Sequence, residues 1–214
     1  MEAEKITLKT LAASLAAVLI AEILLRPAVS ALFSSPLPGI AITRIAEIVL
    51  LLVIVVYFEK NSHAIGLAPE GLTAGIKKGL VWSALFGLAA LVLIIVLHAV
   101  GINALRMLYT PLPFSNLLVI IYLAAGGVIG PVAEEIFFRG ILYGYFRRWG
   151  VYPAVALSTA FFVLPHLNGG LLPITQLVGG IVFALAYEKE DNLMAPITIH
   201  CLGNLAIFSL GLLT

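Results

Sequence analysis

The chain has 214 residues, of which 62% are hydrophobic and only 11% are charged, and its mean hydropathy is +1.13. Soluble domains carry roughly 25% charged and about 45–50% apolar residues, so this composition excludes an ordinary soluble protein. A net charge of +1 gives no sign of the basic face that nucleic-acid binding requires. The single cysteine, Cys201, excludes an internal disulfide and a cysteine-based zinc cluster. We therefore expect a membrane protein.

Apolar segments separated by turns with proline, glycine or charged residues recur along the chain. We place seven of them, at about residues 10–25, 40–58, 78–100, 116–147, 151–166, 171–188 and 193–212. A helix needs about 20 apolar residues to span a bilayer. The fourth segment is too long for one perpendicular span and contains Gly130-Pro131, so we expect it to tilt or kink. The sequence predicts a single all-α, polytopic membrane domain over residues 1–214, with about seven transmembrane helices.

The distribution of Lys and Arg predicts how these helices are oriented. With the N-terminus inside, the cytosolic ends hold Lys5, Lys9, Lys60, Lys77, Lys78, Arg147, Arg148 and Lys189. The outer ends hold only Arg26 and Arg106. The first segment follows Lys5 and Lys9 as a signal peptide would, but its apolar run is long for one, so we expect it to be retained. We expect a cytosolic N-terminus and a C-terminus outside.

Charged residues at membrane depth cost at least ~2.5 kcal/mol each, so each one calls for a reason. In the early segments, Glu22 precedes Arg26 by four residues and Arg44 precedes Glu47 by three. These spacings place each pair on one helix face. We interpret both pairs as neutral packing contacts.

The later segments hold a denser set of polar residues within apolar surroundings. These residues are Glu134, Glu135 and Arg139 in the fourth segment, His166 at the end of the fifth, and His200 and Asn204 in the seventh. Counted at 1.5 Å per residue from the inner helix ends, they lie at depths of roughly 10–22 Å. Side chains from three helices thus lie at similar depths in the membrane. We expect an active site in a cavity between the fourth, fifth and seventh helices.

Helix geometry gives the two glutamates different surroundings. Successive residues turn by about 100°, so Glu134 and Glu135 point in different directions. Glu135 precedes Arg139 by four residues, the favourable order for an ion pair, which leaves Glu134 without a local counter-charge. A carboxylate in apolar surroundings is a stronger base, which suits a general base. The alternative is a hydrogen-bond network that only fastens the helices, and we interpret the neighbouring Cys201 and Asn168 in that way.

Three short motifs, each on its own predicted helix, resemble those of a known membrane family. They are Glu134-Glu135-x-x-x-Arg139, Phe162-x-x-x-His166 and His200-x-x-x-Asn204. In order and type they resemble the CPBP family, the CAAX-protease and bacteriocin-processing membrane proteins, also called Abi. The resemblance covers residues 131–204 and implies a catalytic core over residues 116–212.

The resemblance implies an intramembrane endopeptidase of the glutamic type, without a cofactor. By motif position, Glu134 would be the base that deprotonates a water, and His166 would help to hold that water. His200 and Asn204 would donate hydrogen bonds to the oxyanion of the tetrahedral intermediate. The Glu135–Arg139 pair would support the site.

Several alternatives stay open or are excluded on the residues present. Asp191 is the single aspartate, which excludes a two-aspartate protease, and neither His-Glu-x-x-His nor Gly-x-Ser-Gly occurs. A zinc site built from His166, His200 and Glu134 stays chemically open. A non-catalytic immunity or scaffold protein that binds a peptide in the same cavity is a second function. A transporter with Glu134 as a proton relay is a third, and the lack of internal repeats speaks against it.

The expected partners are membrane lipid and a peptide or membrane-anchored protein, cut near its C-terminus or beside a transmembrane segment. Prenylated CAAX-like tails and prokaryotic leader, signalling or anchor peptides both fit this description. The compact chain favours a prokaryotic inner-membrane enzyme, and hence the second class of substrate.

Overall fold

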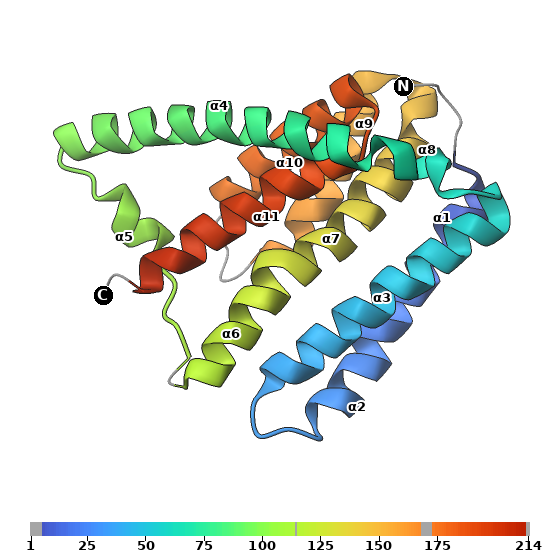
Figure 1. Cartoon of the computed structure of the whole chain (residues 1–214), viewed down its shortest axis with the longest axis horizontal. Coiled ribbons are helices and arrows are strands. Elements are labelled where there is room, and N and C mark those ends of the chain that lie inside the picture. Colours follow the sequence, from blue (N-terminus) through green and yellow to red (C-terminus); the bar gives the residue numbers. More distant parts are fainter. Residues whose placement is uncertain (1–5, 114, 168–172, 213–214) are drawn as a thin grey trace.

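The computed structural model describes residues 6–113, 115–167 and 173–212 (Figure 1). Within these ranges every regular element is a helix, so the predicted all-α class is confirmed. The sequence predictions that involve Lys5, Asn168 and residues 171–172 lie outside the described residues.

Among the described residues, helices occupy most of each of the seven predicted segments. The elements are α1 (Leu8–Ile20), η1 (Ala21–Leu25), α2 (Arg26–Ser30), α3 (Pro36–Glu59), η2 (Ser62–Ile65), η3 (Pro69–Gly71), α4 (Leu72–Ala99), α5 (Ala104–Leu108), α6 (Asn116–Ala124), η4 (Ala125–Ile129), α7 (Gly130–Glu135), η5 (Ile136–Tyr143), α8 (Gly144–Phe146), η6 (Arg147–Trp149), α9 (Val151–Val163), η7 (Leu164–His166), α10 (Ile174–Glu190), α11 (Met194–Ser209) and η8 (Leu210–Leu212).

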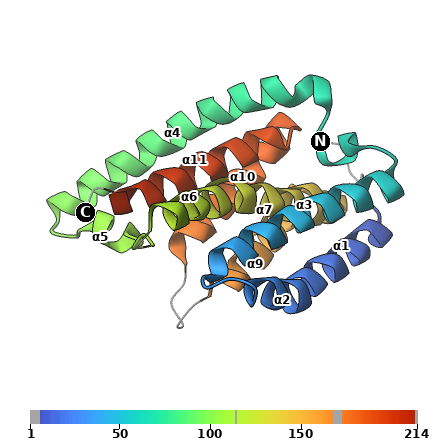
Figure 2. The same cartoon turned by 60° about the horizontal axis from the view of Figure 1, so that its bottom comes forward.

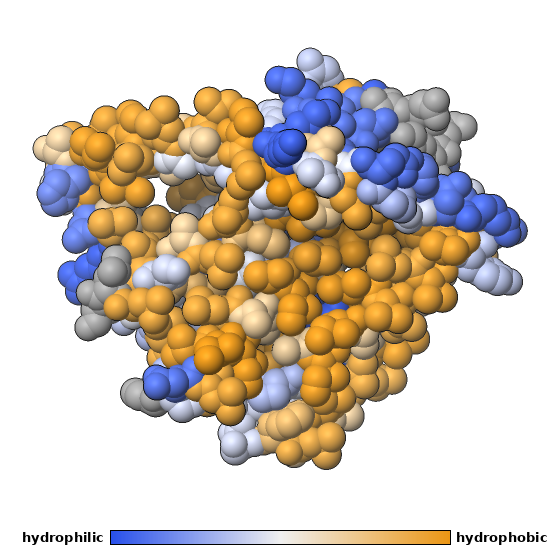
Figure 3. Space-filling view, viewed as in Figure 1, coloured by the Kyte–Doolittle hydropathy of each residue, from blue (hydrophilic) through white to orange (hydrophobic). Residues whose placement is uncertain are grey.

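Five helical stretches in the described chain are long and apolar enough to cross a bilayer. They are Leu8–Ser30, Pro36–Glu59, Ser62–Ala99, Asn116–Trp149 and Met194–Leu212. The fifth and sixth predicted segments form shorter helices, Val151–His166 and Ile174–Glu190. Apolar side chains cover most of the face seen in Figure 3, and hydrophilic ones gather at its edges. The protein is therefore an integral membrane protein.

The helix ends that carry most of the basic residues meet at one end of the bundle (Figure 1). Lys78 at the start of α4 pairs with Glu190 at the end of α10, with 3.0 Å between Nζ and Oε2. Arg148 after α8 donates from Nη2 to the carbonyl oxygen of Ile6 before α1, at 2.6 Å. The shared end agrees with the predicted grouping of basic residues, while the side of the membrane that it faces stays a prediction.

Helix α4 packs along α11 through two glycines that are four residues apart, Gly75 and Gly79. A Cβ on Gly79 would lie 2.8 Å from the carbonyl oxygen of Ala195 and 2.6 Å from the Cβ of Thr198. Only glycine permits this approach, as in other membrane helix pairs with small residues at this spacing.

Substitution Gly79→Val is expected to push α4 away from α11 and to lower the free energy of unfolding by about 1–3 kcal/mol. The matched control is Gly87→Val on the same helix, because a Cβ there has no heavy atom within 4 Å. Thermal unfolding of both variants in bilayer nanodiscs measures the difference. Equal stability of the two variants would show that the α4–α11 contact is looser than the structure indicates.

Helix η5 lies at the centre of the bundle, where it packs against α1, α3, α9 and α10. All eight of its residues are buried. Since η5 follows α7 directly, the polar residues of the fourth predicted segment enter the core of the protein and not its lipid-facing surface. This placement decides the surroundings of the candidate site.

Candidate active site

The helix that carries the two glutamates changes from α to π geometry just before them. Its η4 turn, Ala125–Ile129, ends with the Gly130 N–H bonded to the Ala125 carbonyl, five residues back. The next π-type bond would run from residue 131 to Gly126, but Pro131 has no N–H. Asn204 Nδ2 on α11 donates to that Gly126 carbonyl instead, at 2.9 Å. The predicted irregularity at Gly130-Pro131 is thus a π turn, a feature common at functional sites.

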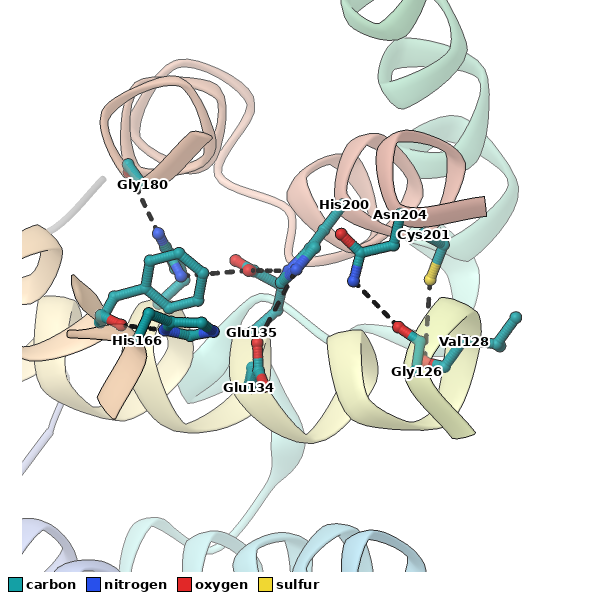
Figure 4. Close-up of polar contacts among 11 residues, drawn as sticks. Gly126, Val128, Glu134, Glu135, His166, Gly180, His200, Cys201 and Asn204 are labelled. Atoms are coloured by element: carbon teal, nitrogen blue, oxygen red, sulfur yellow. Dashed lines mark hydrogen bonds and ion pairs between the residues drawn. The ribbon is translucent and has the colours of Figure 1, made fainter. Parts of the chain in front are cut away.

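Glu135 is the centre of a buried hydrogen-bond network (Figure 4). Its Oε1 accepts from Arg139 Nη1 at 3.1 Å and from His200 Nδ1 at 2.7 Å. Arg139 Nη2 donates in turn to the carbonyl oxygen of Gly180 on α10, at 3.1 Å. The side chains of Glu135 and Arg139 are 0% exposed. The predicted Glu135–Arg139 pair is present, and it connects α7, η5, α10 and α11.

Aromatic rings enclose this network and keep water from the charges. The Arg139 guanidinium lies 4.5 Å from the ring centre of Phe162 and 5.2 Å from that of Phe183. Phe183 also stacks on the ring of His200, with 4.6 Å between the centres and 21° between the planes. Such contacts strengthen electrostatic interactions by excluding solvent. His200 is therefore fixed both by its bond to Glu135 and by the face of Phe183.

Glu134 is the acid of the cluster that stays accessible. Its side chain is 18% exposed, and its Oε2 lies 3.7 Å from His200 Nε2. Figure 4 shows His200 joined to both glutamates, one through each ring nitrogen. Because a carboxylate only accepts, Nδ1 of His200 carries the proton donated to Glu135. The other nitrogen, Nε2, faces Glu134 across a gap longer than a direct hydrogen bond.

His166 lies at the end of the fifth predicted helix, in η7. Its Nδ1 donates to the carbonyl oxygen of Phe162 at 2.8 Å, since a carbonyl oxygen can only accept. In the neutral ring this leaves Nε2 as an acceptor, the form that can receive a hydrogen bond from water. The Phe162 ring packs against both His166 and His200, with centre distances of 5.1 and 5.7 Å. His166 thus borders the site without a direct hydrogen bond to Glu134.

Asn204 and Cys201 bind the backbone of η4 and not the glutamates. Besides the Asn204 bond to Gly126, the Sγ of Cys201 lies 3.8 Å from the carbonyl oxygen of Val128. One N–H of the Asn204 amide is therefore used, and its second N–H is the one that could serve an oxyanion. Cys201 has the structural contact expected from its position.

The two charge pairs predicted in the early helices are both present. Arg26 Nη1 lies 2.8 Å from Glu22 Oε2, and Arg44 Nη1 lies 2.6 Å from Glu47 Oε2. Arg44 Nη2 also reaches Glu22 Oε1 at 3.0 Å, which joins η1 to α3. We call these four residues, Glu22, Arg26, Arg44 and Glu47, the α3 charge cluster. Its cross-helix link was not predicted, because the sequence does not say that these two helices are neighbours.

The sixth predicted helix contributes to the site, although we expected only the fourth, fifth and seventh to do so. Gly180 on α10 supplies a carbonyl to Arg139, and Phe183 supplies the ring that stacks on His200. A Cβ on Gly180 would lie 3.5 Å from Arg139 Nη2 and 2.9 Å from the Cγ2 of Thr159. Neither a glycine nor a phenylalanine is unusual in an apolar helix, so the sequence did not indicate that Gly180 and Phe183 contribute to the site.

No group of three or more His, Cys, Asp or Glu side chains in the described part of the chain is arranged to hold a metal ion. Of the residues in the zinc site considered above, His200 Nε2 lies 3.7 Å from Glu134 Oε2.

Comparison with known proteins gives the same family as the three motifs. Residues 116–206 match the family described as type II CAAX prenyl endopeptidase Rce1-like. A curated relative, the membrane-embedded CAAX protease MroQ of Staphylococcus aureus (strain USA300), is 32% identical over 84 residues. The resemblance to the CAAX-protease family is confirmed.

The similarity covers only part of each protein. It includes 36% of this chain and 34% of the staphylococcal CAAX protease, so the chain spans about a third of the length of the relative it matches. No solved structure matches the chain. The CAAX-protease match, residues 116–206, holds all six polar residues of the site, whereas the α3 charge cluster lies before it.

Proposed function

We propose that this protein is an intramembrane endopeptidase that hydrolyses a peptide bond in a membrane-associated substrate, with Glu134 as the general base. The observation that carries the proposal is the position of the accessible Glu134 carboxylate, whose Oε2 lies 3.7 Å from His200 Nε2. Glu135 and Phe183 hold the His200 ring in place. A base at the edge of a dry, preorganised site can take a proton from water and deliver it to the leaving amine. The match to the CAAX-protease family supports this reaction.

Each polar side chain has a role in the proposed reaction. Glu134 deprotonates the attacking water, and His166 accepts a hydrogen bond from that water at Nε2. His200, when Nε2 carries a proton, and the second N–H of Asn204 donate to the oxyanion. The buried Glu135–Arg139 pair sets the position of His200 and keeps its Nδ1 protonated. No metal takes part in these steps.

The proposed substrate is a peptide or membrane-anchored protein that enters from the lipid, because the site lies in a chain whose outer surface is apolar. Two probes distinguish the substrate classes: a fluorogenic peptide with a farnesylated C-a-a-X tail, and an apolar single-span peptide of about 20 residues. The purified protein in nanodiscs is incubated with each probe, and the products are identified by mass spectrometry. Cleavage that is lost in Glu134→Gln supports the proposal. Binding of both proteins to a probe without cleavage by either would favour the non-catalytic scaffold.

Removal of metal ions is expected to leave the cleavage rate unchanged, because the proposed reaction uses only side chains of the protein. The measurement is the rate of probe cleavage by the wild type before and after dialysis against a strong chelator. Loss of activity that returns on addition of zinc would contradict this prediction and would assign the reaction to a metal ion.

A further inference from the structure

The π turn η4 decides which backbone carbonyl Pro131 leaves without a donor. In an α-helix this would be the carbonyl of Gly127, because each N–H bonds four residues back and proline has none. In η4 the bonds run five residues back, and the Gly130 N–H bonds the carbonyl of Ala125. Gly130 is thereby withdrawn from Gly126, and Pro131 has no N–H to replace it. The carbonyl of Gly126 therefore has neither an α-type nor a π-type donor from the backbone.

Helix α11 supplies the missing donor from a side chain. A carbonyl without a donor is costly at membrane depth. The Asn204 Nδ2 atom lies 2.9 Å from the Gly126 oxygen, and this contact fixes which end of the amide is the nitrogen, since a carbonyl oxygen only accepts. Cys201, three residues before Asn204, lies with its Sγ 3.8 Å from the carbonyl oxygen of Val128. Two side chains of α11 are thus directed at carbonyls of η4 (Figure 4).

The two glycines of η4 allow α11 to approach closely enough for this bond. Figures 1 and 2 both show the helix that runs from α6 to α7 beside α11, and η4 packs against α11. A Cβ on Gly126 would lie 2.9 Å from the Cε2 of Phe208, and a Cβ on Gly127 would lie 2.5 Å from the Cδ2 of Leu205. Any larger residue at either position would have to displace a side chain of α11. The short distance between the backbones keeps Asn204 within reach of its acceptor.

The bond to Gly126 gives the Asn204 amide a fixed orientation. The terminal torsion of an asparagine is broad, so an unbound amide can direct its donors over a wide range. With one N–H bound to Gly126, the second N–H is left with a defined direction. Asn204 follows His200 by one helical turn, which places both side chains on the same face of α11, and Figure 4 shows them side by side. An oxyanion is stabilised most by donors that are oriented before the reaction begins.

We infer that Pro131 is a positioning residue for the proposed reaction: because it lacks an N–H, it leaves the Gly126 carbonyl free to hold the Asn204 amide in the orientation that serves the oxyanion. This inference rests on the proposed function and adds to it a residue that carries no reactive group. Stability alone does not call for the arrangement, since a residue with an N–H at position 131 would let the helix satisfy the carbonyl by itself.

The bond between Asn204 and Gly126 can be tested without a substrate. Glycine labelled with ¹³C at the carbonyl and ¹⁵N at the amide is incorporated, and solid-state NMR in bilayers selects the carbonyls of Gly-Gly pairs. The sequence has three such pairs, Gly126-Gly127, Gly169-Gly170 and Gly179-Gly180. The Gly126 signal is the one that disappears in Gly126→Ala.

The Gly126 signal is expected to depend on Asn204 only while proline is present. In the otherwise natural chain, Asn204→Ala should move the signal upfield, because the carbonyl loses its hydrogen bond. In the Pro131→Ala background, Asn204→Ala should leave the signal in place, because a backbone N–H then holds the carbonyl. A Gly126 signal that Asn204→Ala does not move in the natural background overturns the inference.

Peptide cleavage tests whether Pro131 acts through Asn204. Pro131→Ala is expected to lower kcat by about 10–10²-fold with little change in KM, because a displaced donor no longer meets the oxyanion. In the Asn204→Ala background the same substitution should change kcat by less than about twofold, because no amide is left to displace. The matched control is Pro153→Ala in the first turn of α9, where an N–H has no partner within the helix. It should cleave like the wild type.

The outcomes separate this inference from the proposed function. An equal loss of kcat from Pro131→Ala with and without Asn204 overturns the positioning role, since a purely structural effect would not depend on the amide. If Pro131→Ala does not fold, Pro131→Val supplies the same N–H with a larger side chain. Failure of the proposed function is seen separately, as equal probe cleavage by the wild type and Glu134→Gln, and the NMR measurement does not depend on it.

Discussion

Replacement of Glu134 by glutamine is expected to reduce the rate of peptide cleavage by about 10²–10⁴-fold, with little effect on substrate binding. Glutamine has nearly the same shape, and the carboxylate makes no hydrogen bond in the resting protein that the amide would lose. What disappears is the ability to take a proton from water. The measurement is kcat and KM for the probe that the wild type cleaves. We expect the loss in kcat alone, as for a group that acts only in the transition state.

Two further variants make the test of Glu134 specific. Glu134→Asp keeps the carboxylate but withdraws it by one methylene, so it should retain part of the activity. Glu70→Gln makes the same chemical change at an exposed acid in η3, just before α4, and should cleave like the wild type. Full activity in Glu134→Gln would refute the assignment of the base. A parallel loss in Glu70→Gln would point to a general effect on the protein.

Local spacing was enough to predict the Glu135–Arg139 pair. The two residues are one helical turn apart, so their contact depends only on the helix, and the structure has it at 3.1 Å. The contact of His200 with both glutamates depends on how α11 crosses α7, which no local pattern encodes. The motifs predicted that these residues belong to one site, but not that Glu135 would bind Nδ1 while Glu134 faces Nε2.

The residues that apolar helices contribute to the site could not be predicted from the sequence, for a different reason. In a membrane protein nearly every helix is apolar on all sides, so periodicity does not mark the face that turns inward. Phe183 and Gly180 look like any other residues of α10, yet they hold His200 and Arg139. Arg44 did stand out, as a charge at membrane depth. Its ion pair with Glu22 arises from the packing of η1 on α3, which only the three-dimensional arrangement reveals.

Loss of Arg139 is expected to give the largest destabilisation of any single change in the site. Substitution Arg139→Met leaves Glu135 as a buried carboxylate without its cation, and removes the side-chain donor of the Gly180 carbonyl. Breaking a buried pair by removing one partner costs about 3–5 kcal/mol. Reversible unfolding in nanodiscs by a denaturing detergent measures this loss. The exposed counterpart, Arg26→Met, removes an arginine that is 42% exposed and should cost less than about 1 kcal/mol.

The double variant Glu135→Met/Arg139→Met tests whether this pair serves to orient His200 or to hold the helices together. Two buried methionines of similar volume remove both charges, so much of the stability lost in Arg139→Met should return. Catalysis should not return, because His200 loses the carboxylate that orients its ring and holds its Nδ1 proton. A double variant as unstable as Arg139→Met would show that the destabilisation comes from packing and not from the unpaired charge. Recovery of stability without activity is the result expected if the pair exists to orient His200 and not to hold the helices together.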